Sequence, residues 1–505
     1  MKSKKIITGI LLVGLIVLSA RAGLAQSPPQ ELPNILWITS EDNSPFYLGC
    51  YGSDLGTTPN LDNLAKQGFR YTHAYADAPI CAPSRNTIIT GVYASSGGNQ
   101  HMRSNYSKSK VLQLLPEYFR KLGYYCTNNF KEDYNIEGSK IEEGLPGVIW
   151  DESSTKAHYK NRKPGQPFFA VFNTMISHES SIHPSDSGRT PRHDPAKVKL
   201  PPYHPDTKEI RHDWARYYDV IEKMDAWVGK KLKELEDAGL ADNTIVIYYG
   251  DHGGILARSK RYLYETGTHI PFIIRIPEKY KYLYPAAKTG SAVDRTISLI
   301  DLYPTMLSMV GIRELPKHLQ GRAFLGPLEG EEPSYVHGIR GRMDERVDMM
   351  RSVRDKRFRY IRNYYPYRSN GIYNRYMWRA ASTRSWHQAY LDGRCNAAQS
   401  AYFQIKPVEE LYDTKNDYWE VNNLANDPRY REVLLRMRAE NNRWMERIFD
   451  TGFFPEAELK RISQTQPMYD YMRSGREDIK QHIAVADLAD FATVKDLDQL
   501  SKNLS

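Results

Sequence analysis

The residues with the clearest chemical potential lie around Cys81. Pro83 is a residue type favoured in the first turn of a helix, and residues 84–90 can continue as a helix to Gly91. Residue 81 is then expected at a helix N-terminus, where backbone N–H groups and the helix dipole favour an anion. Arg85, one turn further on, can make a bidentate contact with a tetrahedral oxyanion. An unmodified Cys81 would be a reactive thiol in this setting or, more simply, a small buried side chain.

Acidic and histidine side chains follow three short apolar segments, at positions where a strand would end. These side chains are Glu41 and Asp42, His178, and Asp251 and His252. Functional groups of open α/β sheets gather beyond the carboxyl ends of the strands, so the side chains could converge on one divalent cation. Oxygen-rich ligation favours a hard ion, Ca²⁺ or Mg²⁺. Taken alone, each of these motifs could be a helix cap, a turn or a hydrogen-bonded histidine. Their joint occurrence favours a metal-binding active site.

The segments that must position these residues alternate between strand and helix patterns. Short apolar runs predict strands at 34–39, 168–172, 244–249 and 270–276. Apolar residues at helical spacing predict helices at 213–236 and 299–310. Because continuous apolar strands are buried on both faces, we expect an α/β fold with a large central, mostly parallel sheet sandwiched by helices.

The C-terminal part of the chain has a different pattern. Alternating residues predict antiparallel strands at 349–354 and 358–362, and a long helix is expected at about 427–449. We therefore predict four parts: a signal peptide at 1–25, a catalytic domain at 33–335, a smaller α+β subdomain at 336–450 built on an antiparallel sheet, and a tail at 451–505.

The N-terminus has the pattern of an export signal. A basic start is followed by an apolar run at 6–18 and by small residues before a cleavage position. The run is short of the ~20 residues that a membrane anchor needs, so we expect a periplasmic or secreted protein without an anchor. The formal net charge of +9, of which residues 1–25 carry four charges, suits an anionic substrate, and no nucleic acid is expected. The four cysteines show neither metal-ligand spacing nor a dense disulfide pattern.

Taken together, these motifs resemble those of the formylglycine-dependent sulfatases of the alkaline phosphatase superfamily. The resemblance extends from Pro33 to about Phe454, and the Cys-x-Pro-Ser-Arg motif at 81–85 is highly specific in this context. Other matching segments are Leu48-Gly49-Cys50-Tyr51-Gly52, Thr58-Pro59-Asn60-Leu61-Asp62, Gly250-Asp251-His252-Gly253, Lys260 to Gly267, Leu319-Gln320-Gly321-Arg322 and Glu410-Leu411-Tyr412-Asp413. The implied fold is alkaline phosphatase-like.

The resemblance also implies roles for individual residues. A maturation enzyme would convert Cys81 to formylglycine, whose hydrate attacks sulfur beside one Ca²⁺ ion (Mg²⁺ as the alternative). The metal ligands would be Glu41, Asp42, Asp251, His252 and residue 81. Arg85, Lys131 and Lys260 would neutralise the sulfuryl oxygens, and His178 would protonate the leaving oxygen.

One position departs from the family pattern. The family has Lys-x-His after the third strand; Lys131 fits the lysine, but Asp133 stands where the histidine is expected. His101 and Arg103, in a stretch similar to that of sulfamidase-type members, are expected to bind substrate, and His101 could compensate for the histidine. Because of this departure, a glycan-binding protein that has lost activity remains an alternative. A phosphatase or phosphonate monoester hydrolase remains another, because these enzymes share the metal-binding residues of the superfamily.

The expected substrate is a sulfated polysaccharide or its oligosaccharides, with an N-sulfated sugar as the alternative. The segment 359–378 is basic and rich in tyrosine. Such a segment could stack on sugar rings and pair with sulfates, or it could be a structural layer with exposed arginines.

Overall fold

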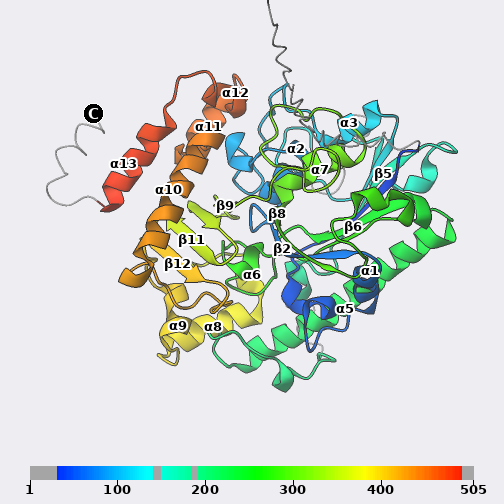
Figure 1. The fold of residues 1–505 in the computed structure, drawn as a ribbon. Coiled ribbons are helices and arrows are strands. Elements are labelled where there is room, and N and C mark those ends of the chain that lie inside the picture. Colours follow the sequence, from blue (N-terminus) through cyan, green and yellow to red (C-terminus); the bar gives the residue numbers. More distant parts are fainter. Residues whose placement is uncertain (1–30, 140–148, 184–189, 492–505) are drawn as a thin grey trace, which may run out of the picture. The chain divides into compact units, whose positions relative to one another are not determined.

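Two separate β-sheets with packed helices make up the described part of the chain. The computed structural model describes residues 31–139, 149–183 and 190–491 (Figure 1). The expected signal peptide at 1–25 lies outside these residues. Within the described ranges, none of the helices combines the length and apolar character needed to span a bilayer.

The larger sheet has eight strands in the order β4-β3-β5-β1-β6-β7-β2-β8. The strands are β1 (Asn34–Ser40), β2 (Phe69–Tyr75), β3 (Tyr125–Asn129), β4 (Glu152–Ser153), β5 (Phe168–Thr174), β6 (Thr244–Gly250), β7 (Phe272–Arg275) and β8 (Ala292–Ser298). All neighbours pair in parallel except β7, which is antiparallel to both β6 and β2. The prediction of a mixed, mostly parallel sheet is therefore confirmed.

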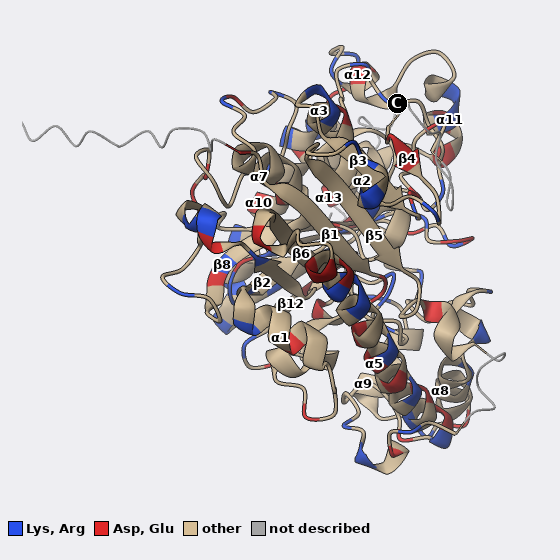
Figure 2. Ribbon diagram, turned by 90° about the vertical axis from the view of Figure 1, so that its right-hand side faces the viewer, with Lys and Arg blue, Asp and Glu red and all other residues tan. Residues whose placement is uncertain are grey.

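Helices cover both faces of this sheet, because alternate side chains of its buried strands point to opposite sides. Leu36 and Ile38 of β1 belong to the core beneath α1 (Pro59–Gln67) and α5 (Lys208–Asp237). Ile35 and Trp37 belong to the core shared with α2 (Cys81–Thr90), α3 (Leu115–Lys121) and α7 (Leu302–Met309). Figure 1 shows the two helical layers, and Figure 2 shows charged residues banded along α5 while the central strands carry none.

The smaller sheet lies in the C-terminal part and is fully antiparallel, with the order β12-β11-β10-β9. Its strands are β9 (Val336–Arg340), β10 (Met350–Arg354), β11 (Phe358–Asn363) and β12 (Glu409–Asp413). The predicted hairpin of β10 and β11 is confirmed. Helix α10 (Arg431–Ile448) packs on this sheet through Leu434 and Met437, and it starts four residues later than predicted.

The tyrosine-rich segment is mainly a structural layer at its start. Tyr360 is buried in the core between β11 and α10, and Arg359 is buried in ion pairs with Glu265 and Glu420. The expectation that the arginines of this segment are exposed is therefore wrong for Arg359, because Glu265 of α6 (Glu265–Thr268) and Glu420 cover its side chain. Tyr367 and Tyr373, further along, are exposed.

Within the described residues, three α-helices follow α10 in the tail. They are α11 (Glu456–Ser463), α12 (Met468–Met472) and α13 (Ile479–Phe491). Leu459 of α11 and Met468 of α12 share a hydrophobic cluster with Trp444 of α10. The described residues from Leu32 onward form one compact unit, so the boundary at 335/336 stays a prediction.

Candidate active site

Helix α2 carries Cys81 at its first residue. Ile80 is the extended N-cap residue, so the helix begins at Cys81 and Pro83 lies in its first turn. The thiol is buried, with its Sγ atom 3.3 Å from Nε2 of His252 and 3.9 Å from Oε2 of Glu41. Residue 81 is thus at a helix N-terminus, as predicted, and it lies among the acids and the histidine that were expected near it.

The strands β1 and β6 bring the two acid-containing turns together. They are parallel neighbours, with Ser40 opposite Gly250, so the chain leaves both strands at the same edge of the sheet. Asp42 has a left-handed backbone (φ 54°), and its N–H donates to Oδ1 of Asp251 at 3.2 Å. Nε2 of His252 lies 3.0 Å from Oδ1 of Asp42, while Nδ1 of His252 is 3.1 Å from the carbonyl oxygen of Gly253. The peptide contact directs Nε2 toward Asp42 and Cys81.

Arg85 crosses the site one turn after Cys81. Its Nε donates to Oδ2 of Asp251 at 3.2 Å, and its Nη2 donates to Oε1 of Glu41 at 3.3 Å. Its Nη1 donates to Oδ1 of Asn173 at 2.8 Å. Three elements therefore fix the guanidinium, and its planar donors are already aligned before any oxyanion arrives.

Two buried lysines complete the positive charge of the site. Nζ of Lys131 lies 2.7 Å from Oε1 of Glu41, and Nζ of Lys260 lies 2.7 and 2.9 Å from the two carboxylate oxygens of Asp42. Burial alone would raise the pKa of Glu41, but Lys131 and Arg85 outweigh it and lower that pKa to about 2. Lys260 and His252 likewise outweigh burial and hold the pKa of Asp42 well below its usual value, so both acids are ionised at neutral pH.

His178 lies at the open side of this cluster, and its side chain keeps 13% exposure. Its Nδ1 accepts the N–H of Ser180 at 3.3 Å, which leaves Nε2 facing Glu41 at 3.9 Å from Oε2. Burial and the nearby Lys260 lower the pKa of His178. The ring of Tyr376 packs beside it, with centroids 6.2 Å apart. Because Nδ1 accepts an N–H, the neutral ring carries its proton on Nε2, the atom that faces Glu41.

The donor atoms of the cluster fit a hard cation. Two groups of possible ligands, Glu41 with Cys81 and His178, and Asp42 with Cys81 and His252, each place their donor atoms within 4.8 Å of one another. Asp251 adds a third carboxylate beside Asp42. The three carboxylates supply most of the oxygen donors of this cluster, which favours Ca²⁺ or Mg²⁺ over a soft metal.

The structure does not join two of the expected residues to this cluster. His101 is buried, and its Nδ1 accepts the N–H of Arg342 at 2.9 Å. Arg103 is exposed, with a left-handed backbone. Within the described ranges, no hydrogen bond or ion pair connects either residue to the surroundings of Cys81. Their assignment to substrate binding stays a prediction.

Asp133 stands at the position that departs from the family pattern. It is buried, and its Oδ2 lies 3.5 Å from Nζ of Lys131. Lys131 in turn contacts Glu41. The carboxylate that replaces the expected histidine therefore reaches the cluster through the lysine two residues before it.

Three supporting residues were not anticipated from the sequence. Asn173 holds Arg85, as described above. The N–H of Glu179 donates to Oδ2 of Asp42 at 2.7 Å, and the carboxylate of Glu179 accepts two bonds from Arg261 at 2.8 and 2.9 Å. The available signal was adjacency, since Glu179 follows His178 and Arg261 follows Lys260 in the sequence.

Comparisons with known proteins agree with this geometry. The sulfatase family model matches residues 33–312, and the model of the N-sulphoglucosamine sulphohydrolase C-terminal region matches residues 250–377. An ulvan-active sulfatase of Formosa agariphila is 39% identical, covering 87% of this chain and 79% of its own length. The human N-sulphoglucosamine sulphohydrolase is 27% identical, covering 88% and 96% respectively.

Solved structures show the same fold at lower identity. The phosphonate monoester hydrolase of Agrobacterium radiobacter aligns with a TM-score of 0.58 and 17% identity over 81% of this chain and 96% of that one. At this identity the likeness concerns the fold alone, so the assignment rests on the sequence matches. The chain belongs to the sulfatase family of the alkaline phosphatase superfamily.

Proposed function

We propose that this protein hydrolyses sulfate groups on a sulfated polysaccharide or its oligosaccharides, with residue 81 acting as formylglycine. The observation that carries the proposal is the position of Cys81 at the N-terminus of α2, among Arg85, Glu41 and His252. Converted to formylglycine by a maturation enzyme, this residue would supply one hydroxyl of its hydrate as nucleophile and a second to release sulfate.

The proposed metal is one Ca²⁺ ion, with Mg²⁺ as the alternative. Glu41, Asp42, Asp251, His252 and the modified residue 81 would hold it, in agreement with their oxygen-rich donor set. Bound there, the cation would supply positive charge that favours an ionised oxygen nucleophile.

Three cations are proposed to neutralise the sulfuryl oxygens. Arg85, Lys131 and Lys260 each contact one of the buried carboxylates, so their charged groups surround the position next to residue 81. Charge that is fixed before reaction and shielded from water stabilises a developing oxyanion most effectively. His178, which faces the same space, is proposed to donate the proton to the leaving sugar oxygen.

The polysaccharide class rests on the relatives. The ulvan-active sulfatase supports a sulfated polysaccharide, and the N-sulphoglucosamine sulphohydrolase supports an N-sulfated sugar as the alternative. Comparing sulfate release from ulvan oligosaccharides and from an N-sulfated glucosamine distinguishes the two. We expect release from the ulvan oligosaccharides, because that relative is the more similar one.

Two experiments test the proposed chemistry. The mass of the peptide containing residue 81, taken from protein made in its native host, should show an aldehyde in place of the thiol. Hydrolysis of an aryl sulfate should exceed hydrolysis of an aryl phosphate or phosphonate ester. An unmodified thiol would contradict the formylglycine mechanism, and dominant phosphatase or phosphonate activity would favour the rival chemistry of this superfamily.

We further propose export to the periplasm or the medium after removal of residues 1–25. The basic and apolar pattern of these residues supports this. N-terminal sequencing of the mature protein tests it; a mature chain that retains residues 1–25 would contradict it.

A further inference from the structure

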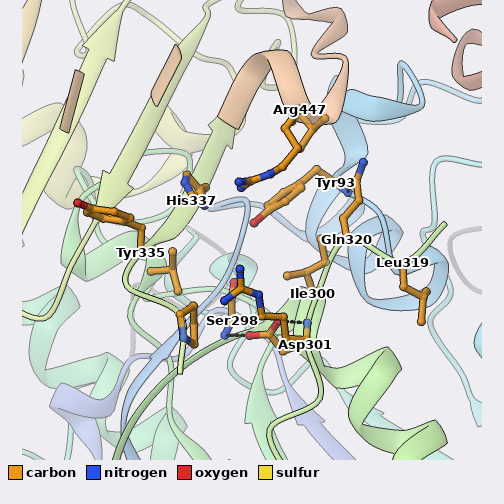
Figure 3. Close-up of a pocket in the computed structure, with 14 residues that line it drawn as sticks. Tyr93, Ser298, Ile300, Asp301, Leu319, Gln320, Tyr335, His337 and Arg447 are labelled. Carbon is orange, nitrogen blue, oxygen red and sulfur yellow. Dashed lines mark hydrogen bonds between the residues drawn. The ribbon is translucent and has the colours of Figure 1, made fainter. Parts of the chain in front are cut away.

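A pocket of about 370 Å³ lies outside the candidate active site, and Figure 3 shows the residues that line it. Its walls come from the end of β8, the loop at 319–322, the start of β9 and the end of α10. Tyr93, which also lines it, follows the C-terminal end of α2, whereas Cys81 begins that helix. Ten helical residues span roughly 15 Å, so the pocket and Cys81 lie at opposite ends of α2. None of the candidate metal ligands, and none of the cations proposed to contact sulfate, lines this pocket.

Two arginines give the pocket a positive rim. Arg322 and Arg447 both line it and both are exposed. In the described ranges, neither guanidinium forms an ion pair with a carboxylate. Figure 3 shows the guanidinium of Arg447 in the space between His337 and Tyr93. Guanidinium groups offer planar paired donors that suit sulfate and carboxylate groups.

The other polar groups of the pocket do not cancel this charge. Burial lowers the pKa of His337, which outweighs the opposing contact with Glu440, so the imidazole is neutral at pH 7. Tyr93 points its hydroxyl into the pocket, and burial keeps its pKa well above its usual value, so it remains a donor.

Asp301 is the acid that lines the pocket, and its carboxylate is already engaged. Its two oxygens accept the backbone N–H groups of Ser298 and Arg322 at 2.9 and 2.8 Å. Burial raises the pKa of Asp301 to about 6, so the carboxylate still carries most of its charge at pH 7 and loses it in mild acid. The two arginines therefore outnumber the one carboxylate of the lining.

We propose that this pocket is a second binding site for an anionic saccharide unit, sulfated or carboxylated, of the polymeric substrate. The inference rests on the proposed function, which supplies the polyanionic chain. The volume is within the ~300–1,000 Å³ range of small-ligand sites. Such a site would raise the affinity for any polymer long enough to occupy it and the candidate active site together, without taking part in the reaction.

The test compares a polymer with a substrate too small to reach both sites. In R447Q and in R322Q, the KM for ulvan should rise about tenfold, as expected for loss of a charge-assisted contact. The kinetics with 4-nitrophenyl sulfate should not change. R431Q is the matched control. Arg431 is exposed at the other end of α10, and its substitution removes the same charge away from the pocket. An unchanged KM for ulvan in both pocket variants would overturn the proposal.

Binding measurements separate this proposal from the proposed function. A C81A protein, which cannot turn over, should bind ulvan, and C81A/R447Q should bind it about tenfold more weakly. This result supports the site even if the wild-type protein releases no sulfate. Titration with inorganic sulfate distinguishes the source of the anion: binding of free sulfate that R447Q abolishes, with ulvan affinity unchanged, would show a free-anion site and refute a saccharide site.

Discussion

Nζ of Lys131 and Oε1 of Glu41 lie 2.7 Å apart in a region where both side chains are buried. A lysine charge held this way needs no reorientation when sulfate binds, which is the main requirement for stabilising a transition state electrostatically. K131M should therefore lower kcat/KM for a sulfate ester about 100- to 1,000-fold. Steady-state kinetics check this, with the mass of residue 81 measured to show that modification is intact. Activity within threefold of wild type would contradict the role of Lys131.

Removing the side chain at position 81 should abolish turnover. Alanine is the best helix former, so C81A preserves α2 while it removes the nucleophile. We expect sulfate release to fall to the background level, with a Tm close to that of the wild-type protein. Residual turnover comparable to wild type would show that another group attacks sulfur.

The effect of replacing His178 on the rate of hydrolysis should depend on the leaving group. An alkoxide sugar oxygen needs a proton in the transition state, whereas 4-nitrophenolate leaves readily without one, so H178N should affect the two substrates unequally. We expect a fall of about 100-fold or more for a sugar sulfate and a much smaller fall for 4-nitrophenyl sulfate. Equal losses on both substrates would indicate that His178 positions the substrate instead of protonating it.

Metal removal should affect both activity and stability. Three carboxylates, Glu41, Asp42 and Asp251, lie within one buried cluster, so a bound cation would stabilise the folded state. At a free Ca²⁺ concentration of 100 times Kd the gain is about 2.7 kcal/mol. Dialysis against a chelator should lower the Tm and abolish sulfate release, and Ca²⁺ should restore both. A Tm and activity that do not respond to chelator would contradict the metal site.

A second ion pair, remote from the site, should matter for folding. Arg351 of β10 donates two hydrogen bonds to Asp450, at 2.6 and 2.7 Å, and neither side chain is exposed. D450A would leave the buried guanidinium unpaired, and we expect it to lower the free energy of unfolding by about 3–5 kcal/mol. Denaturant unfolding measures this. R429A breaks the exposed ion pair of Arg429 with Asp427 and is the control, with an expected change of about 1 kcal/mol or less.

The positions of the acids were predictable because they follow apolar strands. The apolar pattern of β1 and β6 alone assigns the residues that follow them to one edge of a parallel sheet. That Asp42 would bond to Asp251, 209 residues away, could not be derived, because strand order depends on tertiary packing. The alternation around Tyr360 likewise predicted a strand but not which of its faces α10 would cover.

The supporting residues show the same limit. Asn173 and Glu179 have no motif of their own, and their importance comes from the groups that fold against them. Asn173 becomes significant because Arg85 crosses toward it, and Glu179 because Arg261 closes on it. A single sequence supplies residue types at strand ends, while the contacts between those ends are set by the packing of the whole sheet.

The burial of α2 also bears on whether Cys81 could be modified before or after the chain folds. All ten residues of the helix are buried, and Cys81 is 1% exposed. If Cys81 is converted as proposed, the enzyme that converts it would need access to the thiol and its flanking backbone, which the folded helix does not give. The proposed conversion would therefore have to precede folding, and a molecule that folds with the thiol in place would keep it until it unfolds.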